Sequence, residues 1–213
     1  MEFKPWGKTP RLFRDIVITE KIDGSNSAII IERATTDGEP NAIAHVHVDG
    51  ITYTVGAQSR NRIITPGGAN DNHGFAAFVE HNAEALVETL GVGRHYGEWW
   101  GQGIQKRYPV NYRVFSLFNT ERYRDLFEPL RMPDGREAFL ESVPVLYEGE
   151  FSEAAILGAL HVLRDSGSVA TPLCKNPEGI VVFHTQSRQV YKVTLDNNDK
   201  GKWEADGSVS TQD

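Results

Sequence analysis

The feature that most constrains the fold is a lysine placed between two apolar, β-branched runs. Residues 15–18 and 28–31 each predict a strand, and Lys21-Ile22-Asp23-Gly24 lies where the two strands meet. Lysine is rarely buried without a partner, and burial lowers the pKa of a lysine amine, which favours its neutral, nucleophilic form. Asp23 points to the same side of an extended chain as Lys21, so it can orient the amine or help to hold a metal. Gly24 allows backbone to approach a ligand closely. Taken alone, the four residues also fit a surface turn at Asp23-Gly24.

Length, charge and cysteine content limit the class of protein. A chain of 213 residues can bury a substantial core and is expected to form one domain. The formal net charge of −7 argues against a broad basic surface, although a local basic groove stays open. The single cysteine, Cys174, excludes an intrachain disulfide and indicates a reducing compartment. Because the sequence has no apolar run long enough to cross a bilayer and no signal-peptide pattern, we expect a cytoplasmic protein.

The first fourteen residues combine basic and aromatic side chains, which suit a phosphate backbone and stacked bases. An N-terminal segment that covers a sheet edge is the alternative. A second basic pair follows the glycine-rich stretch near residue 100. The candidate nucleic-acid contacts are therefore Lys4, Lys8, Arg11, Arg14, Lys106 and Arg107.

Hydrophobic periodicity predicts both strands and helices, and so an α+β fold. Asp49-Gly50 predicts the turn of a β-hairpin. A helix is expected over 73–90, ended by Gly91, and another over about 153–165, with Ser152 as its N-cap. Strands are expected over 42–48, 51–55, 112–118, 180–183 and 189–195.

The middle of the chain is harder to interpret. In the strand over 112–118, periodicity favours a core position for Phe118 and leaves Phe115 open between the core and a nucleotide pocket. Residues 119–150 predict a loop-rich insertion with a turn at 132–135.

Charged side chains recur next to glycines or in strands. Ser59-Arg60-Asn61-Arg62 concentrates donors that suit phosphate or carboxylate, although a charged loop is also possible. Glu98 lies among aromatics on a strand that runs into a glycine-rich turn, where a carboxylate can bind a ribose hydroxyl. Glu178 lies in a turn before an apolar strand. Lys192 is the one lysine of the strand over 189–195, for which a solvated edge is the alternative.

The order of these stretches resembles the covalent nucleotidyltransferase superfamily, which includes ATP-dependent DNA ligases, RNA ligases and mRNA capping enzymes. The similarity spans residues 20–194, and Gly97-Glu98-Trp99-Trp100-Gly101 with Gln102-Gly103-Ile104-Gln105 is closest to the RNA ligase branch. It implies an α+β adenylyltransferase domain with antiparallel sheets and helices around a nucleotide cleft. We expect one such domain over residues 1–213, with no separate OB or lid domain.

The resemblance implies the chemistry of the site. Lys21 would attack the α-phosphorus of ATP to form lysyl-AMP, with Asp23 in support, and Lys192 would neutralise the α-phosphate. Glu178 and Asp23 would organise Mg²⁺ or Mn²⁺, which prefers oxygen ligands and keeps waters. Such a set suits phosphoryl transfer, which depends on charge neutralisation.

The remaining implied contacts are with the nucleotide. Arg60 or Arg62 would hold the ribose or phosphates, Glu98 would bind the ribose hydroxyl, and Phe115 would stack on adenine. The nucleotide-binding set is therefore Glu20, Arg60, Arg62, Glu98, Phe115, Glu178 and Lys192.

One departure from the family pattern concerns its last motif, which often has two lysines two residues apart. Here the second position is Thr194, so phosphate neutralisation is weaker or Lys200 or Lys202 contributes. The function expected is an ATP-dependent RNA ligase acting on 3′-hydroxyl and 5′-phosphate ends, such as those of nicked RNA. A small DNA ligase, a capping guanylyltransferase and an inactive end-binding protein are the alternatives, and the oligomeric state is open.

Overall fold

A computed structural model describes residues 1–34, 41–105 and 108–196, which belong to two compact units. Unit 1 combines Met1–Lys21 with Pro144–Asp213, whereas unit 2 is the continuous stretch Ile22–Val143. The chain therefore passes from unit 1 to unit 2 immediately after the motif lysine.

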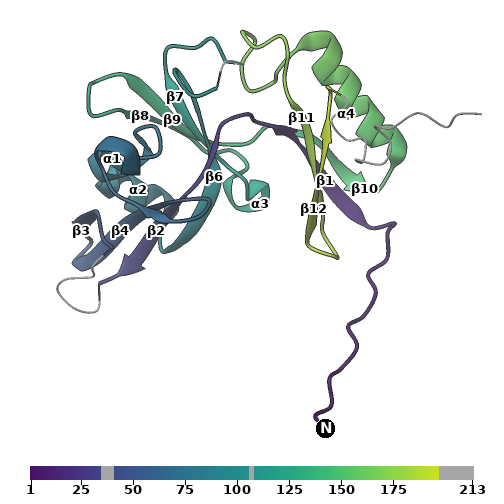
Figure 1. Cartoon of the computed structure of the whole chain (residues 1–213), viewed down its shortest axis with the longest axis horizontal. Coiled ribbons are helices and arrows are strands. Elements are labelled where there is room, and N and C mark those ends of the chain that lie inside the picture. Colours follow the sequence, from purple (N-terminus) through teal and green to yellow (C-terminus); the bar gives the residue numbers. More distant parts are fainter. Residues whose placement is uncertain (35–40, 106–107, 197–213) are drawn as a thin grey trace, which may run out of the picture. The chain divides into compact units, whose positions relative to one another are not determined.

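Unit 1 is a four-stranded antiparallel sheet with one helix against one of its faces (Figure 1). Helix α4 (Glu153–Ser166) begins as predicted, because the Ser152 side chain accepts a hydrogen bond from the Ala155 N–H at 3.4 Å. The apolar side of α4 packs on alternate residues of the inner strands, including Ile16, Ile18 and Ile180. The strands, in the order β10-β1-β11-β12, are β10 (Val145–Glu150), β1 (Asp15–Lys21), β11 (Gly179–His184) and β12 (Gln189–Thr194).

Unit 2 is built on an eight-stranded sheet, with helices that pack on the side of its core. All its strand pairs are antiparallel except β7 with β9, so the prediction of an α+β fold with antiparallel sheets is confirmed. Its strands are β2 (Ser25–Arg33), β3 (Ala44–Val48), β4 (Ile51–Ser59), β5 (Ile63–Ile64), β6 (Gly93–Gly101), β7 (Arg113–Leu117), β8 (Phe127–Arg131) and β9 (Glu137–Ser142). Its helices are η1 (Gly68–Asn70), α1 (Phe75–His81), α2 (Ala83–Leu90) and α3 (Thr120–Tyr123).

The predicted turn and helix of unit 2 are present, with one difference. Asp49 and Gly50 have φ angles of 50° and 77°, as a tight hairpin between β3 and β4 requires. The helix expected over 73–90 is instead two helices, α1 and α2, separated at Asn82. The Asn82 side chain donates to the carbonyls of Phe78 and Arg131, and such competition for backbone groups interrupts a helix.

The prediction of a loop-rich insertion over 119–150 is wrong. This stretch forms α3, the β8–β9 hairpin and β10. The turn at 132–135 closes the hairpin through a hydrogen bond from the Gly135 N–H to the Met132 carbonyl at 2.9 Å. β8 is an edge strand, which explains how it accommodates Pro129.

The core of unit 2 includes a group of aromatic rings among aliphatic side chains. Phe75 lies 4.8 Å from Phe115 and 5.4 Å from Trp99, measured between ring centroids. Trp100, the next residue of β6, packs on Tyr108 instead, with the ring centroids 4.6 Å apart. Phe118, which periodicity places in the core, is 43% exposed, because β7 has ended at Leu117.

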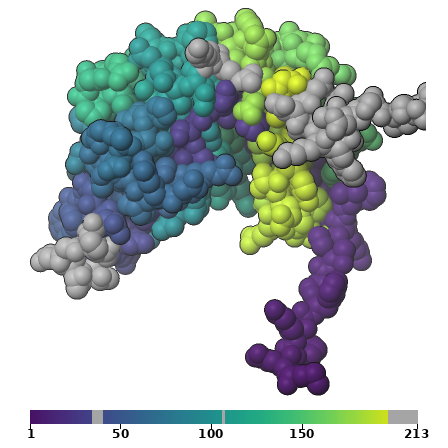
Figure 2. Space-filling model, viewed as in Figure 1, coloured from purple at the N-terminus to yellow at the C-terminus, as the bar shows by residue number. Residues whose placement is uncertain are grey.

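Among the described residues, hydrogen bonds join the N-terminal segment to other parts of unit 1 from Arg11 onward. The Arg11 N–H donates to the Gln186 side chain, and His184 donates from Nε2 to the Leu12 carbonyl. Residues before these extend away from the strands of the same unit (Figures 1 and 2), with Phe3 87% and Trp6 95% exposed. Among the described residues, no helix has the length and apolar character needed to cross a membrane.

Candidate functional site

The motif lysine contacts a carboxylate from a distant part of the sequence. Lys21 ends β1 and lies opposite Gly179 of β11, so Glu178 is next to it. The Lys21 Nζ donates to the Glu178 Oε2 at 2.6 Å, and both side chains are about three-quarters or more buried. A Cβ on Gly179 would lie 2.1 Å from the Val193 carbonyl oxygen, so glycine at this position lets β12 approach.

Strand register places the second predicted lysine on the same face as the first. Lys192 is opposite Val181, which is opposite Thr19 of β1, two residues before Lys21. Directly paired residues project to one face of a sheet, so these side chains share the face that α4 does not cover. Thr194 lies opposite Gly179, and so in line with Lys21.

This register also reveals a residue that sequence reasoning missed. Val181 is half-buried between Thr19 and Lys192 on the uncovered face. Period-two alternation after Glu178-Gly179 was the available signal, since it separates Val181 from the core residues Ile180 and Val182. An apolar side chain beside two lysines can contact a base while the lysines face its phosphates.

Glu20 projects to the opposite face of β1 from Lys21 and is 1% exposed. Its carboxylate accepts hydrogen bonds from the Ser168 hydroxyl at 2.6 Å and from the N–H groups of Val169 and Ala170 at 2.7 and 3.0 Å. Burial raises the pKa of Glu20, although these hydrogen bonds act in the opposite direction. The nucleotide contact expected of Glu20 does not fit this position, where the carboxylate instead fixes residues 168–170.

In unit 2, Glu98 of β6 lies between Asn26 of β2 and Ser116 of β7. It shares its face with Trp100, whose Nε1 donates to the Ser116 hydroxyl at 2.8 Å. A Cβ on Gly24 would lie 2.5 Å from the Trp99 carbonyl oxygen. Glycine at this position therefore lets the chain approach β6 closely.

The side chain of Phe115 is fully buried in the core of unit 2. It pairs with Trp99, whereas Glu98 pairs with Ser116, so Phe115 and Glu98 lie on opposite faces of the sheet. The ring also packs beneath Gly97, where a Cβ would be 2.8 Å from its edge. The adenine contact expected of Phe115 does not match this position, where the ring is a packing residue.

The two arginines that follow β4 are both exposed. Arg62 donates from Nη2 to the Ala69 carbonyl at 3.0 Å, and its own carbonyl accepts from the Ser59 hydroxyl. Arg62 thus orders the turn over 67–70, and Arg60 at the tip of the same loop is accessible to a ligand.

The remaining predicted residues differ in how they are placed. Asp23 is half-buried, and its N–H donates to the Tyr108 hydroxyl at 3.2 Å. Lys106 and Arg107 lie outside the described residues. The other basic candidates are exposed on the N-terminal segment: Lys4, Lys8, Arg11 and Arg14.

A metal would have few protein ligands. Within the described ranges, no three His, Cys, Asp or Glu side chains are grouped so that they could hold an ion. Glu178 supplies a partly exposed carboxylate, and hard divalent cations accept a single carboxylate together with waters and substrate phosphates. The donor set therefore fits Mg²⁺ or Mn²⁺ held largely by its substrate.

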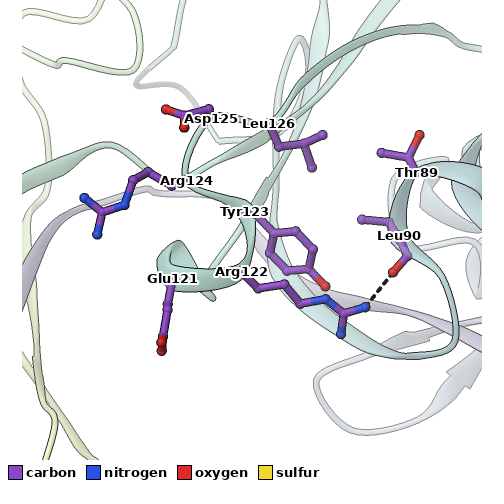
Figure 3. Close-up of a pocket in the computed structure, with 8 residues that line it drawn as sticks. All are labelled: Thr89, Leu90, Glu121, Arg122, Tyr123, Arg124, Asp125 and Leu126. Carbon is purple, nitrogen blue, oxygen red and sulfur yellow. Dashed lines mark hydrogen bonds between the residues drawn. The ribbon is translucent and has the colours of Figure 1, made fainter.

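A pocket in unit 2 is separate from all of these residues. It is lined by α3 and the end of α2, where Arg122 donates to the Leu90 carbonyl at 2.6 Å (Figure 3). None of the motif side chains lines it, so the pocket does not mark the candidate site.

Comparison with known proteins identifies the family. The family model described as RNA ligase matches residues 14–194. Two lysine-to-alanine variants of Naegleria gruberi RNA ligase have a similar fold: an apo structure, with 17% identity and a TM-score of 0.50, and one with ATP and Mn, with 16% identity and a TM-score of 0.51. Each match covers 86% of this chain and 50% of the solved chain, so the chain spans about half the length of these ligases. No curated protein matches the sequence. The family match extends over both units, and the chain belongs to the RNA ligase family.

Proposed function

We propose that this chain is the catalytic part of an ATP-dependent RNA ligase that joins 3′-hydroxyl and 5′-phosphate ends. The observation that carries the proposal is the contact between Lys21 and Glu178 at 2.6 Å, which joins two family motifs 157 residues apart. Lys192 on the same face adds a second cation. The family match and the solved ligase with ATP and Mn support ATP as the substrate.

The first step is nucleophilic substitution at the α-phosphorus of ATP. Lys21 loses a proton, its Nζ forms a bond to phosphorus, and the bond from phosphorus to the bridging oxygen breaks to release pyrophosphate. Lys192 neutralises charge that builds on the α-phosphate oxygens. Because Glu178 accepts a hydrogen bond from the amine, it aligns Nζ, and the proton that the amine loses can pass to this carboxylate.

Glu178 is the carboxylate that would hold a divalent ion, and the lysine motif makes Asp23 the second candidate ligand. A bound ion neutralises negative charge on the phosphates. The protein's own contribution is to keep Lys21 on an inner strand, hydrogen-bonded on both sides, so that the nucleophile has a fixed position.

Two further transfers complete ligation. A 5′-phosphate oxygen attacks the phosphorus of lysyl-AMP, which frees Lys21 and leaves an adenylylated end. The 3′-hydroxyl then attacks the 5′-phosphorus, a phosphodiester forms and AMP leaves. Sealing of nicked RNA is the chemistry that RNA repair requires.

The test is formation of a covalent adduct with ATP labelled at the α-phosphate, in the presence of Mg²⁺. We expect an acid-sensitive adduct in the wild type, none in Lys21→Ala, and an unchanged amount in Lys175→Ala, which removes an exposed lysine of the same unit. Absence of the wild-type adduct, or its persistence in Lys21→Ala, contradicts the proposal.

The polynucleotide is identified by sealing assays on matched nicked duplexes. We expect nicked RNA to be sealed faster than nicked DNA. Preferential sealing of DNA would indicate a DNA ligase, and labelling by GTP instead of ATP would indicate a capping enzyme.

A further inference from the structure

Arg113, the first residue of β7, is a buried arginine whose donors are not all used. The residue is 8% exposed to solvent. Among the described residues, its Nε and Nη1 have no hydrogen-bond partner. Buried donors are nearly always paired in native proteins, so an unpaired guanidinium indicates a missing acceptor.

The Trp99 ring and a glycine-rich turn lie beside the Arg113 guanidinium. The guanidinium carbon lies 5.6 Å from the centroid of the Trp99 ring, which covers one face. A Cβ on Gly103 would lie 3.7 Å from Nη2, so the glycine-rich turn after β6 passes beside the group. Because Gly103 has a φ of 74°, this turn can bring its backbone close without a side chain between.

A second arginine lies close enough to affect the first. Arg136 immediately precedes β9, and its side chain donates a hydrogen bond to the Gln102 side chain at 2.7 Å. Arg136 also donates hydrogen bonds to Asp134. Burial and the charge of Arg136 lower the pKa of Arg113 to about 10, and Asp134 acts in the opposite direction. Arg113 is therefore still charged at neutral pH, and the nearby carboxylate is already bonded to Arg136.

We propose that Arg113 and Arg136 form a binding site for a phosphate group, reached past the turn that contains Gln102 and Gly103. A phosphate supplies several acceptor oxygens, and guanidinium groups bind it through charge-assisted hydrogen bonds. A bound phosphate would accept hydrogen bonds from the unpaired donors of Arg113 and reduce the electrostatic repulsion between the two arginines. The identity of its source rests on the proposed function: the phosphate belongs either to the polynucleotide strand or to ATP.

The binding test uses inorganic phosphate and the full chain. Thermal unfolding is followed in increasing phosphate and in sodium chloride of equal ionic strength. We expect phosphate to raise the wild-type midpoint more than chloride does. Because Arg113→Met loses at least one charge-assisted hydrogen bond, its affinity for phosphate should fall by about tenfold or more.

Two further variants make the result decisive. Arg136→Gln changes a side chain at the surface, so it should fold even if Arg113→Met does not, and it should also weaken the phosphate effect. Arg94→Gln removes an exposed arginine of β6 and should respond as the wild type does. A wild-type response equal to that in chloride, or an undiminished response in both Arg113→Met and Arg136→Gln, overturns the proposal.

Two activity assays distinguish the sources. If the phosphate belongs to ATP, the variants need more ATP to form lysyl-AMP. If it belongs to the strand, lysyl-AMP forms normally, and sealing of pre-adenylylated ends slows. Absence of a wild-type adduct counts against the proposed ligase activity, whereas the phosphate titration still decides the binding site.

Discussion

The two units present the family motifs in different ways. In unit 1, register brings Lys21, Val181 and Lys192 to one open face, and Lys21 touches Glu178 directly. In unit 2, the side chains of Glu98 and Phe115 project to opposite faces of the sheet. The alternation of side chains along a strand therefore decides which motif residues can act together, because residues of different motifs can project to opposite faces of a sheet.

The difference follows from what covers each sheet. Helix α4 covers one face of the sheet in unit 1, and the buried apolar residues of the sheet lie on that face. The opposite face is therefore available for polar and charged side chains. In unit 2, Phe75 and Phe78 of α1 pack on the face that carries Phe115, which fixes that ring in the core. The following predictions test this contrast.

Replacing Phe115 should have the largest effect, and that effect should be on stability. For Phe115→Ala we expect a loss of about 3–5 kcal/mol in the free energy of unfolding, as for a large ring removed from a core. Chemical denaturation measures it. Phe115→Leu, which folds more readily, should keep the wild-type ATP dependence of adduct formation. A large rise in the ATP requirement of Phe115→Leu would show instead that the ring contacts adenine.

Replacing Glu178 should affect chemistry and leave stability nearly unchanged. We expect Glu178→Gln to form lysyl-AMP about 100-fold more slowly, because it removes the negative charge beside Lys21 and the carboxylate proposed to hold the metal. Single-turnover labelling measures the rate. Glu153→Gln, an exposed carboxylate in the first turn of α4 in the same unit, is the control and should be close to wild type. Equal rates for Glu178→Gln and wild type would remove Glu178 from the site.

The effect of Glu20 should be seen in how the free energy of unfolding depends on pH. Its pKa is raised in the folded state, so the folded protein holds this proton more tightly than the unfolded chain does. The contribution of Glu20 is therefore fully present below the unfolded pKa and is lost as pH rises through the folded value. Compared with wild type, Glu20→Gln should therefore gain stability as the pH rises above the unfolded pKa of this carboxyl. Parallel stability curves for the two proteins would contradict the burial effect.

The smallest effect is expected at the departure from the family pattern. Thr194 lies in line with Lys21 across Gly179, so Thr194→Lys adds a cation to the face that carries Lys21 and Lys192. We expect adduct formation to be a few-fold faster. Thr194→Gln, of similar length without charge, should give no such gain, and equal rates for both variants would show that the charge is not responsible.

Local signals in the sequence predicted much of the fold. The β-branched runs around Lys21 form β1 and β2, and Ser152 caps α4. The error over 119–150 arose because β8 and β10 are edge strands with polar residues and a proline, which weakens the alternation on which the prediction depended.

The sequence indicated which residues belong to the candidate site, but it did not predict which of them lie on the same face of a sheet. Glu20 is bound by groups 148 to 150 residues further along the chain, and nothing local indicates them. The burial of Phe115 depends on the register between β6 and β7, and periodicity gives the two faces of β7 without saying which one is covered.

The division of the chain has a consequence for the order in which the protein assembles during synthesis. Unit 1 is made from segments on both sides of unit 2, and the Glu20 N–H donates to the carbonyl of Pro144, where the chain returns. At about 5–20 residues per second, β11 follows β1 from the ribosome after roughly ten to thirty seconds. During that interval unit 2 can fold as a continuous segment, while β1 waits first for β10 and then for β11. Lys21 thus acquires its fixed position only after most of the chain has been translated.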